Sequence, residues 1–433
     1  MNAPCLSLWE SQDIVSGSFI FINEVTIMAD LWYRKDAPKI AMIYGSNPRW
    51  DSSEAELLLA AKYDLIITSR AYARLGDVTA QKQEKLNDNL KRLHDMNPRL
   101  KVLFYFTGGA EYRRGTRYFS DDCFLKTTEG DIINSWPGSC LLNYANPKTV
   151  QCFNDMVDDL WPVGAAVDGI YFDTMFGWFD QWAVELESKK KVKVDANEDG
   201  LEDDISELEP IWIEAKRQIL AHVREAYGDK PYLMVNAGHY SAYARPYADG
   251  NILEDYIDQL LIPEAYSGKT FDQLMDYYQF WSQSPEGRTN CTYINATPGF
   301  DIDYAYDRIN SNAGCNRILQ RGYESLQRMR FGLAFALLGN SHYTFQLSGR
   351  SLGQHWWYPE YDIPIGKPLG EYYRHEDGTY RRDYENAIVV LNNSYHDIQP
   401  HFEQTMRDGT TSWVGRDFNL PSKDGRIYVR VGL

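Results

Sequence analysis

The sequence predicts an α/β protein: a (β/α)8 barrel followed by a small C-terminal antiparallel β domain. Three observations support this prediction. Short apolar runs alternate with amphipathic stretches of helical period, a pattern typical of a parallel sheet covered by helices. Eight such runs can be found, which is the number of strands in a closed barrel. Past Gly349 the alternation gives way to short runs separated by Asn, Asp and Gly turns, as in antiparallel hairpins.

The eight candidate strands are rich in Ile, Val, Leu, Tyr and Phe, as expected for strands buried on both faces. An open doubly wound sheet is the alternative fold, but it would need a phosphate-binding loop after an early strand. Neither GxGxxG nor GxxxxGKS/T is present. The candidate strands lie at 39–46, 63–70, 101–109, 168–176, 231–239, within 249–266, at 291–299 and at 341–349.

Helical patterns separate most of these runs. The stretch 52–63 opens with serine before an apolar periodic run, so a serine N-cap is expected there. The stretch 79–98 stops at its final proline, because proline cannot continue a helix. Further amphipathic stretches lie at 205–228, 270–285 and 323–339.

These patterns predict three segments. Residues 1–33 form a leader or edge segment, 34–369 the catalytic barrel, and 370–433 a β-sandwich-like domain. The apolar stretch near the start is interrupted by Asn23 and Glu24, and no Lys or Arg precedes it, so there is no clear signal peptide. No stretch reaches the roughly 18 uninterrupted apolar residues of a membrane span.

The composition limits the kinds of partner that the protein is expected to bind. A net charge of -17 without a Lys/Arg-rich patch argues against nucleic acid. The 31 tyrosines and 12 tryptophans include rings of the kind that line sugar-binding clefts, although most are expected in the core. The six cysteines contain no CxxC pair, so a zinc knuckle has no support. Cys123 with Cys140, and Cys291 with Cys315, are candidate loop disulfides; free buried thiols are the alternative.

Polar side chains follow the predicted strands, at the end where a (β/α)8 barrel carries its active site. Asp173 ends the fourth strand within "DGIYFDTMFGW". A carboxylate among aromatic rings is costly to desolvate unless it is paired or used. No metal-binding triad and no GxSxG nucleophile motif accompany it. The other residues expected at this end are Tyr44, Ser69, Arg70, Tyr105, Thr107, Asn236, His239, Asn295 and Gln346.

The sixth strand offers a second carboxylate in two ways. "GNILEDY" would place Glu254 at the strand end, whereas "QLLIPEAY" would place Glu264 there. Glu254 is favoured because Pro263 is awkward in a central strand. Carboxylates on strands four and six fit glycosidic bond cleavage, which needs one acid and one attacking or stabilising carboxylate. In the alternative interpretation, Asp173 caps the following helix or pairs with Arg70.

Several segments resemble a family of (β/α)8 barrels known as hypothetical glycosyl hydrolase family 15. They are "DGIYFDTMFGW" with the acidic loop after it, "MVNAGH", "GNILEDY" and "RRDYENAIVVLN", and the resemblance covers roughly residues 38 to 400. The order of Asp after strand four, Asn after strand five and Glu after strand six is also similar to several retaining barrel glycosidases. The resemblance implies the fold, the reaction class and catalytic roles for Asp173 and Glu254, but no substrate.

The first functional hypothesis is a retaining glycoside hydrolase acting on a polysaccharide or oligosaccharide. Asp173 would be the nucleophile, and Glu254 or Glu264 the acid/base. The substrate-binding candidates are Tyr44, Arg70, Tyr105, Asn236, His239, Tyr266 and Gln346, with Trp178, Trp356 and Trp357 as stacking platforms or, alternatively, as packing residues.

Two other hypotheses belong to different classes. A non-catalytic carbohydrate-binding barrel predicts the same aromatic residues, but no second carboxylate within reach of Asp173. A polysaccharide lyase would need a base and a cation beside an acidic sugar, for which Tyr240, His239 and Arg70 are the candidates.

The segment "DANEDGLEDDISE" predicts a calcium loop. It has the D-x-N-x-D-G spacing that wraps oxygen ligands around Ca²⁺, with Gly200 at the tight turn. Ser206 stands at the twelfth position, where a bidentate Glu is expected, and a solvated acidic loop is the alternative. Calcium would be structural and would order the loop close to Asp173, and it favours an extracellular or periplasmic location. The expected ligands are Asp195, Asn197, Asp199, Leu201 and Asp203.

Overall fold

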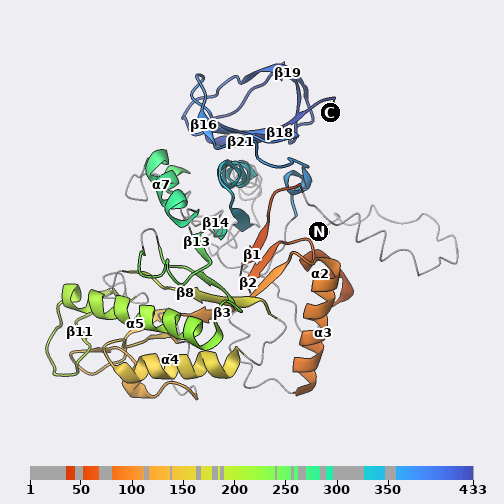
Figure 1. Cartoon of the computed structure of the whole chain (residues 1–433). Coiled ribbons are helices and arrows are strands. Elements are labelled where there is room, and N and C mark those ends of the chain that lie inside the picture. The colour runs from red at the N-terminus through yellow and green to blue at the C-terminus, as the bar shows by residue number, and fades with distance from the viewer. Residues whose placement is uncertain are drawn as a thin grey trace, which may run out of the picture.

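The body of the molecule is an eight-stranded parallel sheet flanked by helices (Figure 1). The computed structural model describes residues 36–43, 52–67, 80–108, 110–111, 117–136, 139–161, 167–177, 184–185, 190–238, 241–254, 258–261, 270–282, 289–295, 326–346 and 357–432. All eight predicted strands are confirmed. In sheet order they are β1 (Ala41–Ile43), β2 (Leu65–Ile67), β3 (Lys101–Thr107), β8 (Gly169–Asp173), β12 (Tyr232–Val235), β13 (Gly250–Glu254), β14 (Thr289–Asn295) and β15 (His342–Gln346).

The sheet curls until its first and last strands meet. Ile40 and Tyr343 form a parallel bridge, and the Tyr343 N–H donates to the Lys39 carbonyl at 2.9 Å. Every neighbouring pair of strands in the sheet is parallel. This strand order is the one expected for a (β/α)8 barrel.

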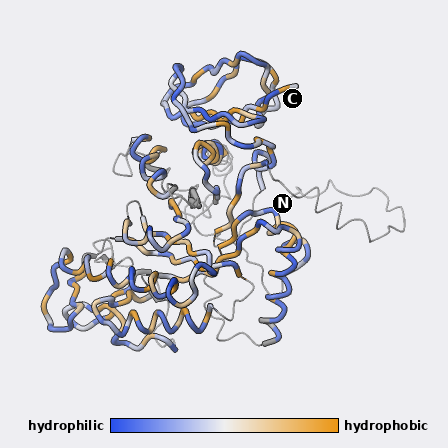
Figure 2. Tube along the Cα trace, in the orientation of Figure 1, coloured by the Kyte–Doolittle hydropathy of each residue, from blue (hydrophilic) through white to orange (hydrophobic). Residues whose placement is uncertain are grey.

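The strands have two apolar faces, because successive side chains point to opposite sides. One set forms a separate inner cluster of Ala41, Ile43, Leu65, Ile67, Leu103, Tyr105, Tyr171, Met234 and Ile252. The alternate residues, such as Phe104 and Phe172, join the larger cluster formed with the helices. In Figure 2 the apolar colour follows the strands of the sheet, whereas α3 (Ala80–Met96) is mainly hydrophilic.

Among the described residues, the helices follow the strands as the sequence predicts, with two additions, one long and one short. The predicted serine cap is Ser53, whose Oγ accepts the Glu56 N–H in a capping box. The sequence pattern missed α4 (Pro147–Leu160), although Asn146 caps it and proline opens it. α4 lies beside α5 (Ile205–Tyr227), as Figure 1 shows. The other helices are α2 (Glu54–Ala60), α6 (Asp258–Leu261), α7 (Phe271–Ser282) and the helical residues 326–338.

The loops after β3 and β8 contain several short strands and a short 3-10 helix. The sequence predicts none of these elements, because segments this short show no clear hydrophobic periodicity of their own. They are β4 (Ala110–Glu111), η2 (Asp121–Cys123), β5 (Lys126–Thr127), β6 (Asn134–Trp136), β7 (Ser139–Leu141), β9 (Val184–Glu185), β10 (Lys190–Lys191) and β11 (Val194–Asp195), with η5 (Pro359–Asp362) nearer the C-terminus.

The C-terminal part forms one six-stranded antiparallel sheet (Figure 1, blue). One of its faces holds a cluster that includes Phe402, Phe418 and Tyr428, while alternate residues such as Val389 join the cluster of the main body. In sheet order the strands are β16 (Tyr373–Arg374), β17 (Tyr380–Asp383), β18 (Ala387–Asn392), β21 (Asp424–Arg430), β19 (His401–Asp408) and β20 (Val414–Asp417).

This sheet packs closely on the main body. Arg330, in the helical segment 326–338, donates from Nε and Nη2 to the two carboxylate oxygens of Asp424, both at 3.0 Å and both buried. Phe271 stacks on Tyr380 with 3.7 Å between ring centroids. The expected domain limits at 34–369 and 370–433 stay a prediction, and the expected segment 1–33 lies outside the described residues.

Two further expectations concern cysteines and membranes. The disulfide between Cys123 and Cys140 is not formed, because both thiols are free. Cys123 Sγ instead lies 4.0 Å from Cys152 Sγ, also a free thiol. The pair Cys291–Cys315 cannot be followed, since Cys315 lies outside the described residues. Within the described residues, no helix is long and apolar enough to cross a membrane.

Candidate active site

Asp173 ends β8 and belongs to the inner face of the sheet, because it follows the inward Tyr171 by two residues. Its side chain is buried, with 6% of its surface exposed. Tyr105 Oη donates to Oδ2 at 2.7 Å, and Tyr171 Oη donates to Oδ1 at 3.3 Å. The backbone N–H of Thr174 and Asn236 Nδ2 also donate to Oδ1, at 2.8 and 3.0 Å. These donors offset the cost of burying a carboxylate.

Asn236 links Asp173 to a second carboxylate. It follows β12 directly and is buried, and its Nδ2 also donates to Glu254 Oε2 at 2.6 Å. One nitrogen therefore contacts both acids. The two accepting oxygens cannot be farther apart than 3.0 plus 2.6 Å, about 5.6 Å. Unlike Asp173, Glu254 is exposed, so it is open to solvent.

The strand order brings these three residues together. β8, β12 and β13 are adjacent, and each of the three side chains comes at the carboxyl end of its strand. Glu254 is the last residue of β13, as the interpretation of "GNILEDY" as the sixth strand predicts. Residues 259–261 of the competing run belong to α6, not to a strand. Glu264 lies outside the described residues, so the structure does not compare the two glutamates directly.

The alternative role of Asp173 as a helix cap is not supported by the described residues that follow it. Its Oδ1 accepts the N–H of the next residue, whereas a cap accepts from two or three residues on. Residues 174–177 are not helical. Arg70, the proposed ion-pair partner, lies outside the described residues.

The backbone around Asp173 is closely packed. The Gly108 N–H donates to the Asp173 carbonyl at 2.6 Å. A Cβ at Gly108 would lie 2.3 Å from Met175 Sδ and 2.7 Å from the Asp173 carbonyl oxygen, so no larger residue fits without movement. Tyr144 donates its hydroxyl to the Gly108 carbonyl, and burial raises the pKa of Tyr144 well above its usual range. This tyrosine therefore stays protonated and keeps donating.

The sequence does not predict some of the residues that contact Asp173 or the turn after it. Tyr171 reads as a core residue, although its spacing of two from Asp173 places both on one strand face. Thr174 adopts a positive φ of 56°, which is rare for a β-branched residue. Lys216 of α5 contacts the turn after Asp173 from about 40 residues away, and no local pattern signals such a contact.

Of the other predicted site residues, Tyr105 lies beside Asp173 and donates its hydroxyl to it, and its role in substrate binding stays a prediction. The backbone of Gln346 pairs with Asn295 at the carboxyl ends of β15 and β14. Trp357 is not brought to this end. Its ring packs edge-on against Tyr63, which precedes β2, at 5.3 Å. Composition alone could not tell at which end of the sheet this ring lies. Tyr44, Arg70, Trp178, His239, Tyr266 and Trp356 lie outside the described residues, as does Tyr240.

The acidic loop has a defined backbone. Asp195 is buried and accepts the N–H groups of Asp199 and Gly200 at 3.1 and 2.8 Å. The Ala196 N–H donates to Asp203 Oδ2 at 2.6 Å, and Asn197 Oδ1 accepts the Asp199 N–H at 2.9 Å. Gly200 has the positive φ of 84° that the predicted tight turn requires.

In the part of the chain that the structure describes, no three His, Cys, Asp or Glu side chains group as a metal site. Leu201, the expected carbonyl ligand, is largely exposed. The calcium assignment therefore stays a prediction.

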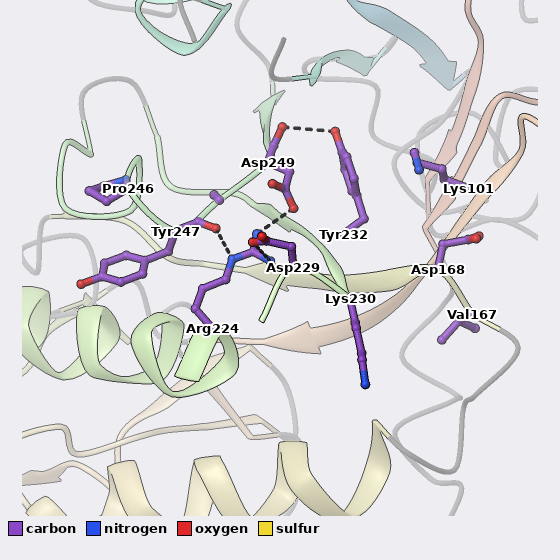
Figure 3. A pocket seen from close by; sticks show the side chains of 11 residues that line it. Lys101, Val167, Asp168, Arg224, Asp229, Lys230, Tyr232, Pro246, Tyr247 and Asp249 are labelled. Atoms are coloured by element: carbon purple, nitrogen blue, oxygen red, sulfur yellow. Dashed lines mark hydrogen bonds and ion pairs between the residues drawn. The ribbon is translucent and has the colours of Figure 1, made fainter. Parts of the chain in front are cut away.

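A separate pocket of about 560 Å³ opens at the opposite end of the sheet (Figure 3). It lies where β3, β12 and β13 begin, and Lys101, Tyr232 and Asp249 line it. Arg224 donates to Asp249 at 2.7 Å and to the Tyr247 carbonyl at 2.8 Å. Its guanidinium is thus used in holding the loop before β13, and the pocket has no part in the site around Asp173.

Two carboxylates joined through one amide, at the carboxyl ends of three successive parallel strands, form the kind of centre that glycosidases use. Comparison with known families agrees. A model of hypothetical glycosyl hydrolase family 15 matches residues 94–388, and the chain belongs to this family, as the sequence resemblance predicts. The matched region contains Asp173, Asn236 and Glu254.

Several solved structures match the chain. A maltogenic α-amylase, AmyB, from Thermotoga neapolitana is 10% identical, with 92% of this chain and 99% of that chain covered and a TM-score of 0.51. An α-amylase from Geobacillus thermoleovorans is 12% identical over 91% and 98% of the two chains, with a TM-score of 0.46. The glycoside hydrolase domain of PelA from Pseudomonas aeruginosa is 11% identical over 73% and 96%, with a TM-score of 0.39. No curated protein matches the chain.

Proposed function

We propose that this protein is a retaining glycoside hydrolase on a closed (β/α)8 barrel, acting on a polysaccharide or oligosaccharide. The observation that carries the proposal is the double contact of Asn236 Nδ2, which keeps the two carboxylate oxygens within about 5.6 Å. Retaining glycosidases hold their carboxyl groups about 5–5.5 Å apart, whereas inverting enzymes need about 6.5–9.5 Å to admit a water.

The two acids receive their roles from their surroundings. Asp173 is buried and held by four described donors, which suits a nucleophile that must attack from one fixed position. Glu254 is exposed and suits the acid/base, which must meet first the leaving group and then water.

The reaction proceeds in two steps. A carboxylate oxygen of Asp173 bonds to the anomeric carbon while the glycosidic bond breaks, and the leaving oxygen takes the proton of Glu254. Glu254, now ionised, removes a proton from a water molecule. The water oxygen attacks the anomeric carbon, the ester to Asp173 breaks, and a sugar of unchanged anomeric configuration is released.

The non-catalytic carbohydrate-binding barrel is less well supported. That hypothesis expects no second carboxylate within reach of Asp173, whereas Glu254 shares a donor with it. Secretion to an extracellular or periplasmic compartment remains part of the proposal, since polymeric glycans are met there.

Product release from a panel of α- and β-linked glucans, galactans, mannans, xylans and amino-sugar polymers tests the proposal. For Asp173→Asn we expect kcat/KM to fall at least about 10⁴-fold, because the nucleophile is lost. For Glu254→Gln we expect a fall of about 10²–10⁴-fold, because general acid/base catalysis is lost. Circular dichroism verifies folding, and Glu202→Gln, an exposed acid in the loop after β8, is the matched control.

The initial product anomer, followed by proton NMR, tests the stereochemistry. Retention supports the proposal, and inversion overturns the retaining part. Full activity in Glu254→Gln would transfer the acid/base role to another acid, with Glu264 the first candidate. Binding of a glycan without cleavage by the wild type would favour the carbohydrate-binding alternative.

A further inference from the structure

Lys216 breaks the pattern of the helix that carries it. α5 turns Trp212, Ala215, Ile219 and Leu220 into the core, and Lys216 lies on the same face with 1% of its surface exposed. An apolar residue is the expected occupant of such a position. A buried lysine destabilises the folded protein unless its ammonium group is paired. Proteins keep charged residues in apolar positions mainly where function needs them.

The contacts of Lys216 all lie on one short segment. Its Nζ donates to the Thr174 carbonyl at 3.1 Å and to the Phe176 carbonyl at 2.9 Å. Among the described residues, both partners are backbone carbonyls, and no carboxylate forms an ion pair with it. Burial accordingly lowers the pKa of Lys216 to about 7. Within the described part of the chain, the desolvation cost of the lysine is therefore offset by two backbone carbonyls and not by a carboxylate.

The segment that Lys216 holds directly follows Asp173. Thr174 has the left-handed φ of 56°, a conformation that is strained for a β-branched residue. In this conformation its N–H donates to Asp173 Oδ1. The next residue, Met175, is held from two other sides. Its N–H donates to the Asn236 carbonyl at 2.8 Å, and its carbonyl accepts from Tyr243 Oη at 2.5 Å.

We propose that Lys216 is a positioning residue, which holds the strained turn of Thr174 so that its N–H orients the carboxylate of Asp173. The inference rests on the proposed function, in which Asp173 attacks the sugar. The lysine acts through the backbone and does not touch the substrate. Two carbonyls, on either side of Met175, are fixed by one Nζ, so the turn cannot relax at Thr174 without breaking a contact at Lys216.

The test compares Lys216→Met with wild type on the polysaccharide panel described above. Methionine fills similar volume but removes the Nζ donor and with it both hydrogen bonds. We expect kcat to fall about 10–100-fold with KM changed less than threefold, because a displaced nucleophile slows the chemical step more than binding. Hydrogen exchange of peptides covering 170–178 should become faster. Ile219→Val, one turn along the same buried face, is the matched control and should leave both readouts unchanged.

A second substitution separates positioning from general stability. Thr174→Gly adopts a positive φ without strain and keeps the N–H. If Lys216 acts by holding this turn, the double variant Lys216→Met/Thr174→Gly should regain at least tenfold of the lost kcat. Independent, additive losses would overturn the inference. If the methionine variant does not fold, Lys216→Gln replaces it in the same comparison with Thr174→Gly. Glutamine keeps an N–H donor on a shorter side chain, so kcat of Lys216→Gln should lie between those of wild type and Lys216→Met.

The outcomes distinguish the two proposals. Wild type that cuts no member of the panel overturns the proposed function, and the inference with it. Wild type that cuts a glycan while Lys216→Met keeps the same kcat and the same exchange overturns the inference alone. A loss of kcat with rescue by Thr174→Gly supports both.

Discussion

At the scale of the residue, the candidate nucleophile depends on donors that reach it from three neighbouring strands. Tyr105 supplies the donor from β3, Tyr171 from β8 itself, and Asn236 from the end of β12. Each donor belongs to an element that is fixed by the sheet, so the carboxylate is oriented before substrate arrives. Such preorganisation is the usual source of rate in a polar site that excludes water.

The hydroxyl of Tyr105 provides a test of this orientation. Tyr105→Phe removes one hydrogen bond to a charged group and leaves the ring packing in place. A bond of this kind contributes about 1.5–3 kcal/mol, so kcat/KM should fall roughly 10–100-fold. Tyr395→Phe, at a tyrosine with 72% of its surface exposed, is the matched control. Unchanged kinetics in Tyr105→Phe would mean that this donor does not orient Asp173.

Lys216 gives a prediction about pH and stability. Its folded-state pKa of about 7 lies below its ordinary value of 10.5, because burial disfavours the charged form. Between these two values the unfolded chain holds a proton that the folded protein lacks, so stability rises with pH across this window. Relative to Lys216→Met, the free energy of unfolding of wild type should rise by about 1.4 kcal/mol per unit between pH 7 and 10. Urea titrations across this range measure it, and parallel curves would contradict it.

At the scale of the element, apolar runs were sufficient to find the sheet, and strand ends were sufficient to find its acids. Asp173 and Glu254 could be predicted because each polar residue interrupts an apolar run at the point where its strand stops. Ser53 could be predicted because a serine before a periodic run caps a helix.

The rest of the site depends on tertiary contacts that leave no local pattern. Tyr171 looks like any buried aromatic residue, and Lys216 looks like an ordinary residue of a mixed helix. Composition leaves Trp357 open between a sugar platform and a packing residue, and its aromatic neighbours Tyr63 and Tyr361 favour packing. The end of the sheet at which such a loop packs depends on contacts across the whole chain. No local sequence pattern therefore predicts it.

The acidic loop between β11 and α5 supports a prediction about calcium. If Asp195, Asn197, Asp199 and Asp203 bind Ca²⁺, millimolar Ca²⁺ should raise the melting temperature and EDTA should reverse the rise, because a ligand that binds only the folded state stabilises it. Mg²⁺ at equal concentration is the control and should have a smaller effect. An unchanged melting temperature would mean that the loop is held by its own backbone N–H groups, which Asp195 and Asp203 accept.

At the scale of the whole molecule, the C-terminal sheet and the main body form one packed structure. Gly425 of β21 lies directly against the helical segment 326–338, where a Cβ would be 2.4 Å from the Ala334 Cβ and 2.6 Å from the Arg330 carbonyl. Beside it, Arg330 and Asp424 form a buried ion pair. The absence of a side chain at Gly425 therefore permits the close approach of sheet and helix.

Gly425→Ala should destabilise the whole protein by about 1–3 kcal/mol, because the backbone at the contact cannot yield. Gly370→Ala is the matched control, since a Cβ there would meet nothing within 4 Å. Chemical denaturation followed by tryptophan fluorescence and by far-ultraviolet circular dichroism measures both variants. Two separate transitions, with only the second affected by Gly425→Ala, would mean that the sheet unfolds independently.

The bridge between Ile40 and Tyr343 has a consequence for biosynthesis. The strand that closes the sheet leaves the ribosome about 300 residues after the strand it pairs with. At about 5–20 residues per second, β1 waits some 15–60 s as an unpaired, apolar edge. During that interval the unpaired edge of β1 can pair with strands of other chains and start aggregation. Chaperones that bind apolar segments are therefore most needed in this interval. Slower initiation, which spaces nascent chains on the messenger, and faster elongation, which shortens the wait, should therefore both improve the yield of folded protein.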